Sequence, residues 1–135
     1  MAVILREQLP DKDAYFALFN TTGWNRVYQM SPDDLEMANR NSWLVISAYH
    51  EDRLVGFGRV VTDQILHAMI YDMIVIPEYQ RQGIGTRILA ALVKRCREAD
   101  IKDIQLFSAR GKREFYERNG FEVRPEDAPG MQLRK

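Results

Sequence analysis

The segment that decides the fold is Met73-Ile74-Val75-Ile76-Pro77-Glu78-Tyr79-Gln80-Arg81-Gln82-Gly83-Ile84-Gly85-Thr86. An apolar run ends at Pro77, a turn with two glycines follows, and residues 83–100 carry an apolar stripe at helical spacing. The first backbone amides of a helix have no partner inside it, and together with the helix dipole they suit an anion, typically a pyrophosphate. Glycines also let the backbone approach such a ligand closely. The segment therefore predicts a strand, an anion-binding turn and a long helix.

Spacing separates the classes of phosphate-binding turn. A P-loop requires G-x-x-x-x-G-K-[ST], and Gly83 and Gly85 are too close together for it. A dinucleotide-binding fingerprint requires a third glycine where Ile88 stands, and its ribose-binding acid should follow the next strand, whereas Asp103 precedes that strand. From the turn alone, a plain helix cap without a ligand stays open.

Outward from this segment, the chain alternates between strand-like and helix-like runs. Ser31-Pro32-Asp33-Asp34 marks a helix start, because Ser suits the N-cap, Pro the first turn and acids the positive helix end. The strand over 67–76 is apolar except for Asp72, so we expect it to be buried on both faces. The order indicates an α/β or α+β fold on one mixed sheet. Strands are expected over residues 3–7, 42–49, 54–62, 67–76, 104–107, 121–124 and 131–134, and helices over residues 11–19, 31–40, 83–100 and 112–118.

The composition is that of one globular domain, residues 1–135. The hydrophobic fraction is 46%, and 19 basic residues balance 19 acidic ones, which argues against nucleic acid or an acidic membrane as a partner. No apolar run approaches the roughly 20 residues of a membrane span, and we expect no signal peptide. Cys96 is the one cysteine, and with His50 and His67 it shows no metal-ligand spacing. We therefore expect no metal and a reducing, cytoplasmic location.

Two motifs give the glycine turn a more specific meaning. Gln80-x-x-Gly83-x-Gly85 resembles the [QR]-x-x-G-x-[GA] acyl-CoA signature of the GNAT superfamily of N-acyltransferases, in the same strand–helix context. Phe115-Tyr116-x-x-x-Gly120-Phe121, which starts 30 residues after Gly85, resembles the second signature of the family. The resemblance covers residues 42–124. A closer likeness to small bacterial members and to plant and cyanobacterial arylalkylamine (serotonin) N-acetyltransferases rests on Trp24, Arg59 with Asp63, the strand Asp72–Val75, Leu106-Phe107 and Pro129-Gly130-Met131.

The resemblance implies a mostly antiparallel sheet of six to seven strands with about four helices, splayed between the fourth and fifth strands. Acetyl-CoA is then the co-substrate, and its pantetheine arm pairs with backbone groups of Met73 and Val75 in the gap, like an added strand. A continuous sheet without a gap is the alternative. Many members have Asn and Ala where Ser108 and Lys112 stand, and Ser108 keeps a hydrogen-bonding group there. The expected cofactor-binding residues are Met73, Ile74, Val75, Gln80, Arg81, Gln82, Gly83, Ile84, Gly85, Thr86, Ser108 and Phe115, and for Phe115 packing is favoured over contact with the cofactor.

Acetyl transfer to an amine needs a proton for the departing thiolate and a route for the proton of the amine. Tyr116 occupies the tyrosine position of the family, and a phenol is protonated at neutral pH, so Tyr116 is the candidate general acid. A core aromatic whose hydroxyl caps a backbone group is the alternative. Asp72 is the candidate base because it is the only acid inside an apolar strand, and a structural carboxylate is an equal alternative. His67 and a water relay are other routes for that proton.

Four residues are candidates for the amine site. Trp24 follows a Thr-Thr-Gly break in a region that covers the acceptor site in the family, and Asp63 could attract a cationic amine or could be a turn residue. Met69 and Tyr71 should share the face of Met73, because side chains alternate along a strand. For Arg81, Arg87, Arg110, Lys112 and Arg113, a solvated surface is favoured over contact with the cofactor's phosphates.

These features predict an acetyl-CoA-dependent N-acetyltransferase that acts by direct transfer to a small-molecule primary amine, as a monomer or homodimer. A ping-pong route through Cys96 is disfavoured, because that cysteine lies on the apolar stripe of a helix and a buried thiol stays protonated. The remaining alternatives are an acyl-CoA sensor of the same fold without catalysis, and an N-acetyltransferase for a protein or peptide.

Overall fold

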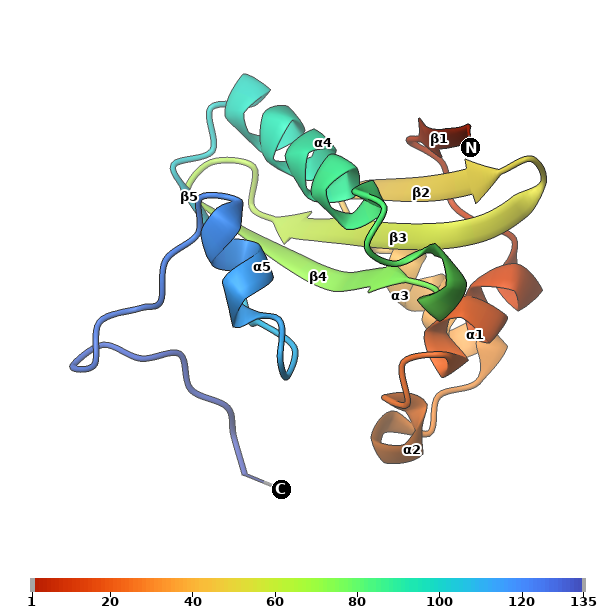
Figure 1. Ribbon diagram of the computed structural model, residues 1–135. Helices are drawn as coiled ribbons and strands as arrows, with labels where there is room; N and C mark the ends of the chain where they lie inside the picture. The colour runs from red at the N-terminus through yellow and green to blue at the C-terminus, as the bar shows by residue number, and fades with distance from the viewer. Residues whose placement is uncertain (1, 135) are drawn as a thin grey trace. The chain divides into compact units, whose positions relative to one another are not determined.

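The computed structural model describes residues 2–134 (Figure 1). The chain divides into two compact units, one ending at Gln105 and one beginning at Leu106, so that the boundary falls inside the last strand, β5 (Asp103–Leu106). No helix within residues 2–134 is both long enough and apolar enough to cross a membrane.

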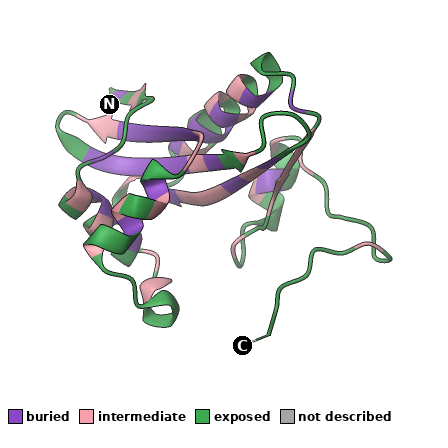
Figure 2. Cartoon of the chain, turned by 180° about the vertical axis from the view of Figure 1, so that it is seen from behind, coloured by how far each residue is buried: buried purple, intermediate pink, exposed green. Residues whose placement is uncertain are grey.

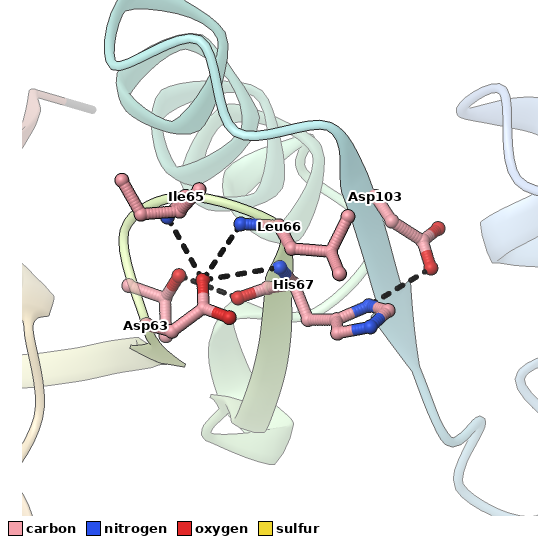
Figure 3. Close-up of polar contacts among 6 residues, drawn as sticks. Asp63, Ile65, Leu66, His67 and Asp103 are labelled. Carbon is pink, nitrogen blue, oxygen red and sulfur yellow. Dashed lines mark hydrogen bonds and ion pairs between the residues drawn. The ribbon is translucent and has the colours of Figure 1, made fainter.

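The first unit is built on a sheet whose strands follow the chain order β1-β2-β3-β4-β5. The first four strands are β1 (Val3–Arg6), β2 (Leu44–His50), β3 (Arg53–Thr62) and β4 (His67–Val75), and each neighbouring pair among them is antiparallel. β5 lies beside β4, where the backbone N–H of Asp103 donates to the carbonyl of Leu66 at 2.8 Å. Both strands start at this contact and run in the same direction (Figure 3). The sheet is therefore mixed, as predicted.

Helices cover both faces of this sheet (Figure 1). α1 (Lys12–Asn20) and α3 (Pro32–Arg40) lie on one face, where the ring of Tyr15 meets the ring of Phe57 edge-on at 4.6 Å. The predicted start of α3 is confirmed: Ser31 and Asp34 form a capping box, each side chain bonding the backbone N–H of the other. α4 (Ile84–Glu98) lies on the opposite face.

The core follows β2, β3 and the inner stripe of α4, which are coloured as buried in Figure 2. Gly58 allows α4 to approach the sheet closely. A Cβ atom at Gly58 would lie 2.8 Å from the sulfur of Met73 and 2.9 Å from a methyl carbon of Leu92, which is closer than side-chain atoms tolerate. The first unit therefore has one core on each face of its sheet.

The predicted numbers of strands and helices were wrong. Residues 2–134 contain five strands and five α-helices, against the expected six to seven strands and about four helices. Segments 121–124 and 131–134 form no strand, because no neighbouring strand in the described chain pairs with their backbone groups. α2 (Asn25–Tyr28) was not predicted, since a single turn is too short to show an apolar stripe.

The expectation that β4 is buried on both faces was also wrong. Ala68, Ile70 and Ile74 are buried, whereas Met69 and Tyr71 are only half-buried. β4 carries a bulge: Arg59 of β3 faces Tyr71 and Phe57 faces Ile74, so Gly58 stands opposite two residues. Asp72, one of these two, has a left-handed φ of 57°.

The second unit contains α5 (Arg113–Arg118) and a segment without regular structure. α5 ends as predicted at Asn119-Gly120: Gly120 has a φ of 93°, and the N–H of Phe121 donates to the carbonyl of Tyr116 at 3.0 Å. Further along, the N–H of Ala128 donates to the carbonyl of Pro125 at 2.9 Å, which closes a turn.

Candidate functional site

The glycine turn connects β4 to α4 and leaves the start of this 15-residue helix uncapped by any side chain. The turn begins with the 3-10 helix η1 (Pro77–Tyr79). Arg81 and Gly83 then take left-handed conformations, with φ of 64° and 82°. Gly83 is the N-cap residue of α4 and is exposed, and a Cβ atom placed on it would have no neighbour within 4 Å. The first amides of α4 therefore have no side-chain cap, and the positive end of the helix dipole lies at the turn.

The charged residues around the turn have different surroundings. The guanidinium of Arg87 donates to the carbonyl of Val3 at 2.9 Å, so it anchors β1 to α4. Arg81 is exposed and forms no ion pair with any residue between 2 and 134. An exposed arginine beside uncapped helix amides fits a diphosphate, and Arg81 is the better placed of the two for that contact. The side chains of Ile74 and Ile84 are buried in the core, so only their backbone groups can meet a ligand.

Gln80 closes the turn from the strand side. Its side-chain amide donates to the carbonyl of Val75 at 2.8 Å. The N–H of Ile76 donates to Val55 in β3, and successive backbone groups of a strand point in opposite directions, so the carbonyl of Val75 points away from β3. Gln80 therefore occupies the carbonyl of Val75 on this outer edge. The backbone N–H of Val75, which points to the same side as its carbonyl, stays available to a ligand.

Asp72, the candidate base, forms an ion pair across the bulge. Its carboxylate accepts from Nε of Arg59 at 2.8 Å, and the two side chains are 24% and 17% exposed. The guanidinium of Arg59 also donates to Ser42 at 3.2 Å and lies over the ring of Tyr71 at 5.5 Å. The burial of this cluster is incomplete, and the ion pair matches the structural alternative for Asp72.

The bulge also changes which residues share a face. Tyr71 lies with Arg59 and Phe57 on the side of α1, whereas the sulfur of Met73 lies near Gly58 on the side of α4. The expectation that Met69 and Tyr71 share the face of Met73 was therefore wrong, because the extra residue reverses the alternation. Nothing in the sequence near Asp72 marks this insertion.

The other candidates for the amine site have clear structural contacts. Trp24 precedes α2 and packs its ring edge-on against Phe19, with centroids 5.8 Å apart. One carboxylate oxygen of Asp63 accepts from the N–H groups of Ile65, Leu66 and His67, at 2.8, 2.8 and 3.2 Å (Figure 3). These three hydrogen bonds lower the pKa of Asp63 below its ordinary value. His67 is exposed and lies 3.2 Å from the carboxylate of Asp103.

In the second unit, Tyr116 is the buried centre of a small aromatic cluster. Its ring lies edge-on to Phe115 at 5.0 Å and to Phe121 at 6.1 Å, and Phe115 is half-buried. Burial raises the pKa of the Tyr116 phenol above its ordinary value, so the hydroxyl stays protonated at neutral pH. Ser108 is exposed, and its hydroxyl donates to the carbonyl of Ala109 at 2.9 Å.

Cys96 and the candidate metal-binding side chains complete the description of the reactive groups. Cys96 is fully buried in α4, and burial raises the pKa of its thiol, so it stays protonated. Residues 2–134 contain no group of three or more His, Cys, Asp or Glu side chains placed to hold a metal ion.

Sequence reasoning gave no role to His50, Tyr79 or the Asp72–Arg59 pair. His50 and Tyr79 are bonded to each other at 2.6 Å, although they are 29 residues apart in the chain. Arg59 and Asp72 are 13 residues apart. Both pairs join segments that meet only in the folded chain, so they leave no local pattern in the sequence.

Comparison with known proteins supports the likeness of these motifs. The profile of the acetyltransferase (GNAT) domain matches residues 19–129. A histone acetyltransferase, TAP1 of Glycine max, is 34% identical over 134 residues, which cover 90% of this chain and 57% of that protein. A probable acetyltransferase of methicillin-resistant Staphylococcus aureus has the same fold, with a TM-score of 0.84, 25% identity and coverage of 99% of this chain and 100% of that one.

A further structure with this fold is the PaiA N-acetyltransferase of Thermoplasma acidophilum in complex with coenzyme A. Its TM-score is 0.74 at 20% identity, and the match covers 96% of this chain and 94% of that one. The chain spans 57% of the length of its curated relative TAP1. The fold and the family match together define the class of protein, an acyltransferase domain. The chain belongs to the GNAT family of acetyltransferases.

Proposed function

We propose that this chain is an acetyl-CoA-dependent N-acetyltransferase that transfers the acetyl group directly to a primary amine of a small molecule. The observation that carries the proposal is the turn after β4, where Arg81 and Gly83 are left-handed and the first amides of α4 are uncapped. An anion with several phosphate oxygens suits such a turn. The similar fold that was determined with coenzyme A supports the same ligand.

The amides of residues 83–86 and the side chain of Arg81 would hold the diphosphate of the cofactor. β5 has four residues and β4 has nine, so at about 3.3 Å per residue β5 reaches less than half of β4. This difference supports the proposed splay, in which the edge of β4 near Met73 and Val75 is open to the pantetheine arm. Acetyl-CoA, when bound, supplies an acetyl group activated as a thioester.

The amine must lose a proton before it can attack. An alkylamine with a pKa near 10.4 is neutral in only about one molecule in 2,500 at pH 7, a penalty of about 4.6 kcal/mol. We assign this proton to the carboxylate of Asp72, whose side chain remains 24% exposed beside the bulge. Tyr116 donates a proton to the departing thiolate, because burial keeps its phenol protonated.

Two substitutions separate a base from a structural carboxylate at position 72. Asp72→Asn and Arg59→Gln both break the ion pair, but only the first removes the carboxylate. If Asp72 is the base, Asp72→Asn lowers kcat on the order of 10²-fold more than Arg59→Gln does, when both are compared per folded molecule. Equal losses would assign Asp72 to the structure alone.

The acceptor is proposed as a small molecule, and a protein amine is the second candidate because TAP1 is named a histone acetyltransferase. The test is incubation of the chain with acetyl-CoA and a panel of amines: an arylalkylamine, a polyamine, an aminoglycoside, an amino acid and a lysine peptide. Mass detection of acetylated product identifies the acceptor class. Saturable CoA binding with no product from any amine would instead favour a sensor. We also propose that the chain is located in the cytoplasm, because a reducing compartment suits its free thiol at Cys96.

A further inference from the structure

The end of the β2–β3 hairpin contacts η1, the short helix that opens the glycine turn. His50 and Arg53 face each other across the two-residue turn of this hairpin, so their side chains leave the sheet side by side. Nδ1 of His50 lies 2.6 Å from the hydroxyl of Tyr79. Arg53 donates to the carboxylate of Glu78 at 2.7 Å and lies over the ring of Tyr79 at 5.6 Å. Two side chains of one hairpin thus hold two of the three residues of η1.

The backbone continues this connection toward the glycines. Ile76, just before η1, is buried and donates its N–H to Val55 at 3.0 Å, and the N–H of Tyr79 donates to the carbonyl of Ile76 at 3.0 Å. Tyr79 is two residues from left-handed Arg81 and four from left-handed Gly83. Because left-handed conformations are costly for a residue with a side chain, the turn keeps its shape only if the neighbouring chain holds it.

We infer that His50 and Tyr79 are positioning residues for the cofactor site: their hydrogen bond holds η1 and thereby keeps the glycine turn in the shape that receives the diphosphate. This inference rests on the proposed function. When only a fraction of molecules has a binding-competent turn, the apparent Kd rises by the inverse of that fraction. The bond therefore acts on cofactor affinity without touching the cofactor.

The test is the Kd for CoA of Tyr79→Phe, measured by calorimetry, with the melting temperature of the ligand-free protein recorded beside it. Tyr79→Phe removes the hydroxyl and keeps the ring under Arg53. We expect Kd to rise about three- to tenfold, the range that one net hydrogen bond allows. The matched control is Tyr49→Phe on the adjacent residue of β2, whose ring lies under Arg6 instead, and its Kd should equal that of the unchanged chain. A lower melting temperature with an unchanged Kd in Tyr79→Phe would overturn the inference.

A double-mutant cycle gives a second readout. His50→Phe removes the same hydrogen bond from the other side, so the double variant should have nearly the Kd of either single variant. His50→Gln, which keeps an acceptor, should restore part of the affinity. If the fold-increase in Kd of the double variant equals the product of the two single increases, the two residues act separately and the inference is contradicted.

Failure of the inference can be told apart from failure of the proposed site by Gly83→Asp. If Gly83→Asp weakens CoA binding and Tyr79→Phe does not, only the positioning role is wrong. If neither changes Kd while CoA still binds, the glycine turn is not the cofactor site and both are wrong.

Discussion

At the scale of single residues, substitutions of Gly83 can separate the effect of its left-handed backbone from the effect of charge beside the uncapped amides. Its φ of 82° is strained for most residues, but a Cβ atom there would meet no atom within 4 Å. Gly83→Asp places a negative charge at the uncapped amides, so we expect Kd for CoA to rise at least tenfold by charge repulsion. Gly83→Asn is the control, because Asn has a similar size, tolerates a left-handed φ and carries no charge. Equal Kd values for the two variants would remove the electrostatic argument.

Tyr116→Phe tests the proposed acid. Phe keeps the edge-on packing with Phe115 and Phe121, so the melting temperature should change little. Loss of the proton donor should lower kcat on the order of 10²-fold with little change in KM for acetyl-CoA, because the interaction strengthens only as charge develops on sulfur.

The pH profile gives an independent measure of the same role. Burial raises the pKa of Tyr116, so the high-pH fall in kcat belongs above the ordinary tyrosine range and should weaken in the Phe variant. Tyr28→Phe, at an exposed position of α2, should match the unchanged chain in both rate and profile. A folded Tyr116→Phe variant with normal turnover, measured where chemistry is rate-limiting, would mean that another group donates the proton.

At the scale of elements, the carboxylate of Asp63 stabilises the connection between β3 and β4. Asp63 accepts three backbone N–H bonds, which lower its pKa. A carboxylate with a lowered pKa in the folded state adds stability at pH values above its unfolded pKa of about 3.9, and this stability is lost as pH falls through the folded pKa. Asp63→Ala should therefore melt at a lower temperature than the unchanged chain at pH 7.

The difference in melting temperature should narrow as pH is lowered below about 4, because the unchanged chain then loses the same contribution. Asp127→Ala, in an exposed segment of the second unit, is the control and should show no such pH dependence. A difference that stays constant down to low pH would mean that Asp63 acts by its shape and not by its charge.

The elements that the sequence predicted well are those with local signals. The helix start at Ser31, the apolar stripe of α4 and the Asn119-Gly120 ending of α5 each depend on residues close together in the sequence, and all three were confirmed. The bulge at Asp72 could not be predicted, because it depends on the register against β3. The segments 121–124 and 131–134 looked like strands by composition, yet a strand forms only where a partner exists.

The same distinction holds for the candidate site. The glycine turn was predicted from its motif, and its left-handed residues and uncapped amides agree with that prediction. The contacts of Asp72 with Arg59 and of Gln80 with Val75 come from distant or folded-back groups that no spacing rule describes. The roles of Trp24, Met69, Tyr71, Ser108 and Phe115 in binding stay predictions.

At the scale of the whole molecule, a ligand that binds only the folded chain must raise its melting temperature. CoA at a hundredfold excess over Kd should add about 2.7 kcal/mol to the free energy of unfolding, which for a chain of 135 residues is a shift of several degrees. Adenosine at the same concentration should shift the melting temperature much less, because in the proposed binding mode the uncapped amides and the β4 edge contact the diphosphate and the pantetheine arm. Equal shifts from the two ligands, measured by thermal scans, would contradict the proposed binding mode.

Because Cys96 is completely buried, its reaction with an alkylating reagent can be used to detect detachment of α4 from the sheet. Because this is the one sulfhydryl in the sequence and it sits on the inner side of α4, an alkylating reagent can react only while that helix is detached from the sheet. When reclosing is faster than alkylation, the labelling rate reports the equilibrium population of the detached state, and when alkylation is faster, it reports the rate of detachment. No engineered probe is needed, because Cys96 is the one cysteine in the sequence.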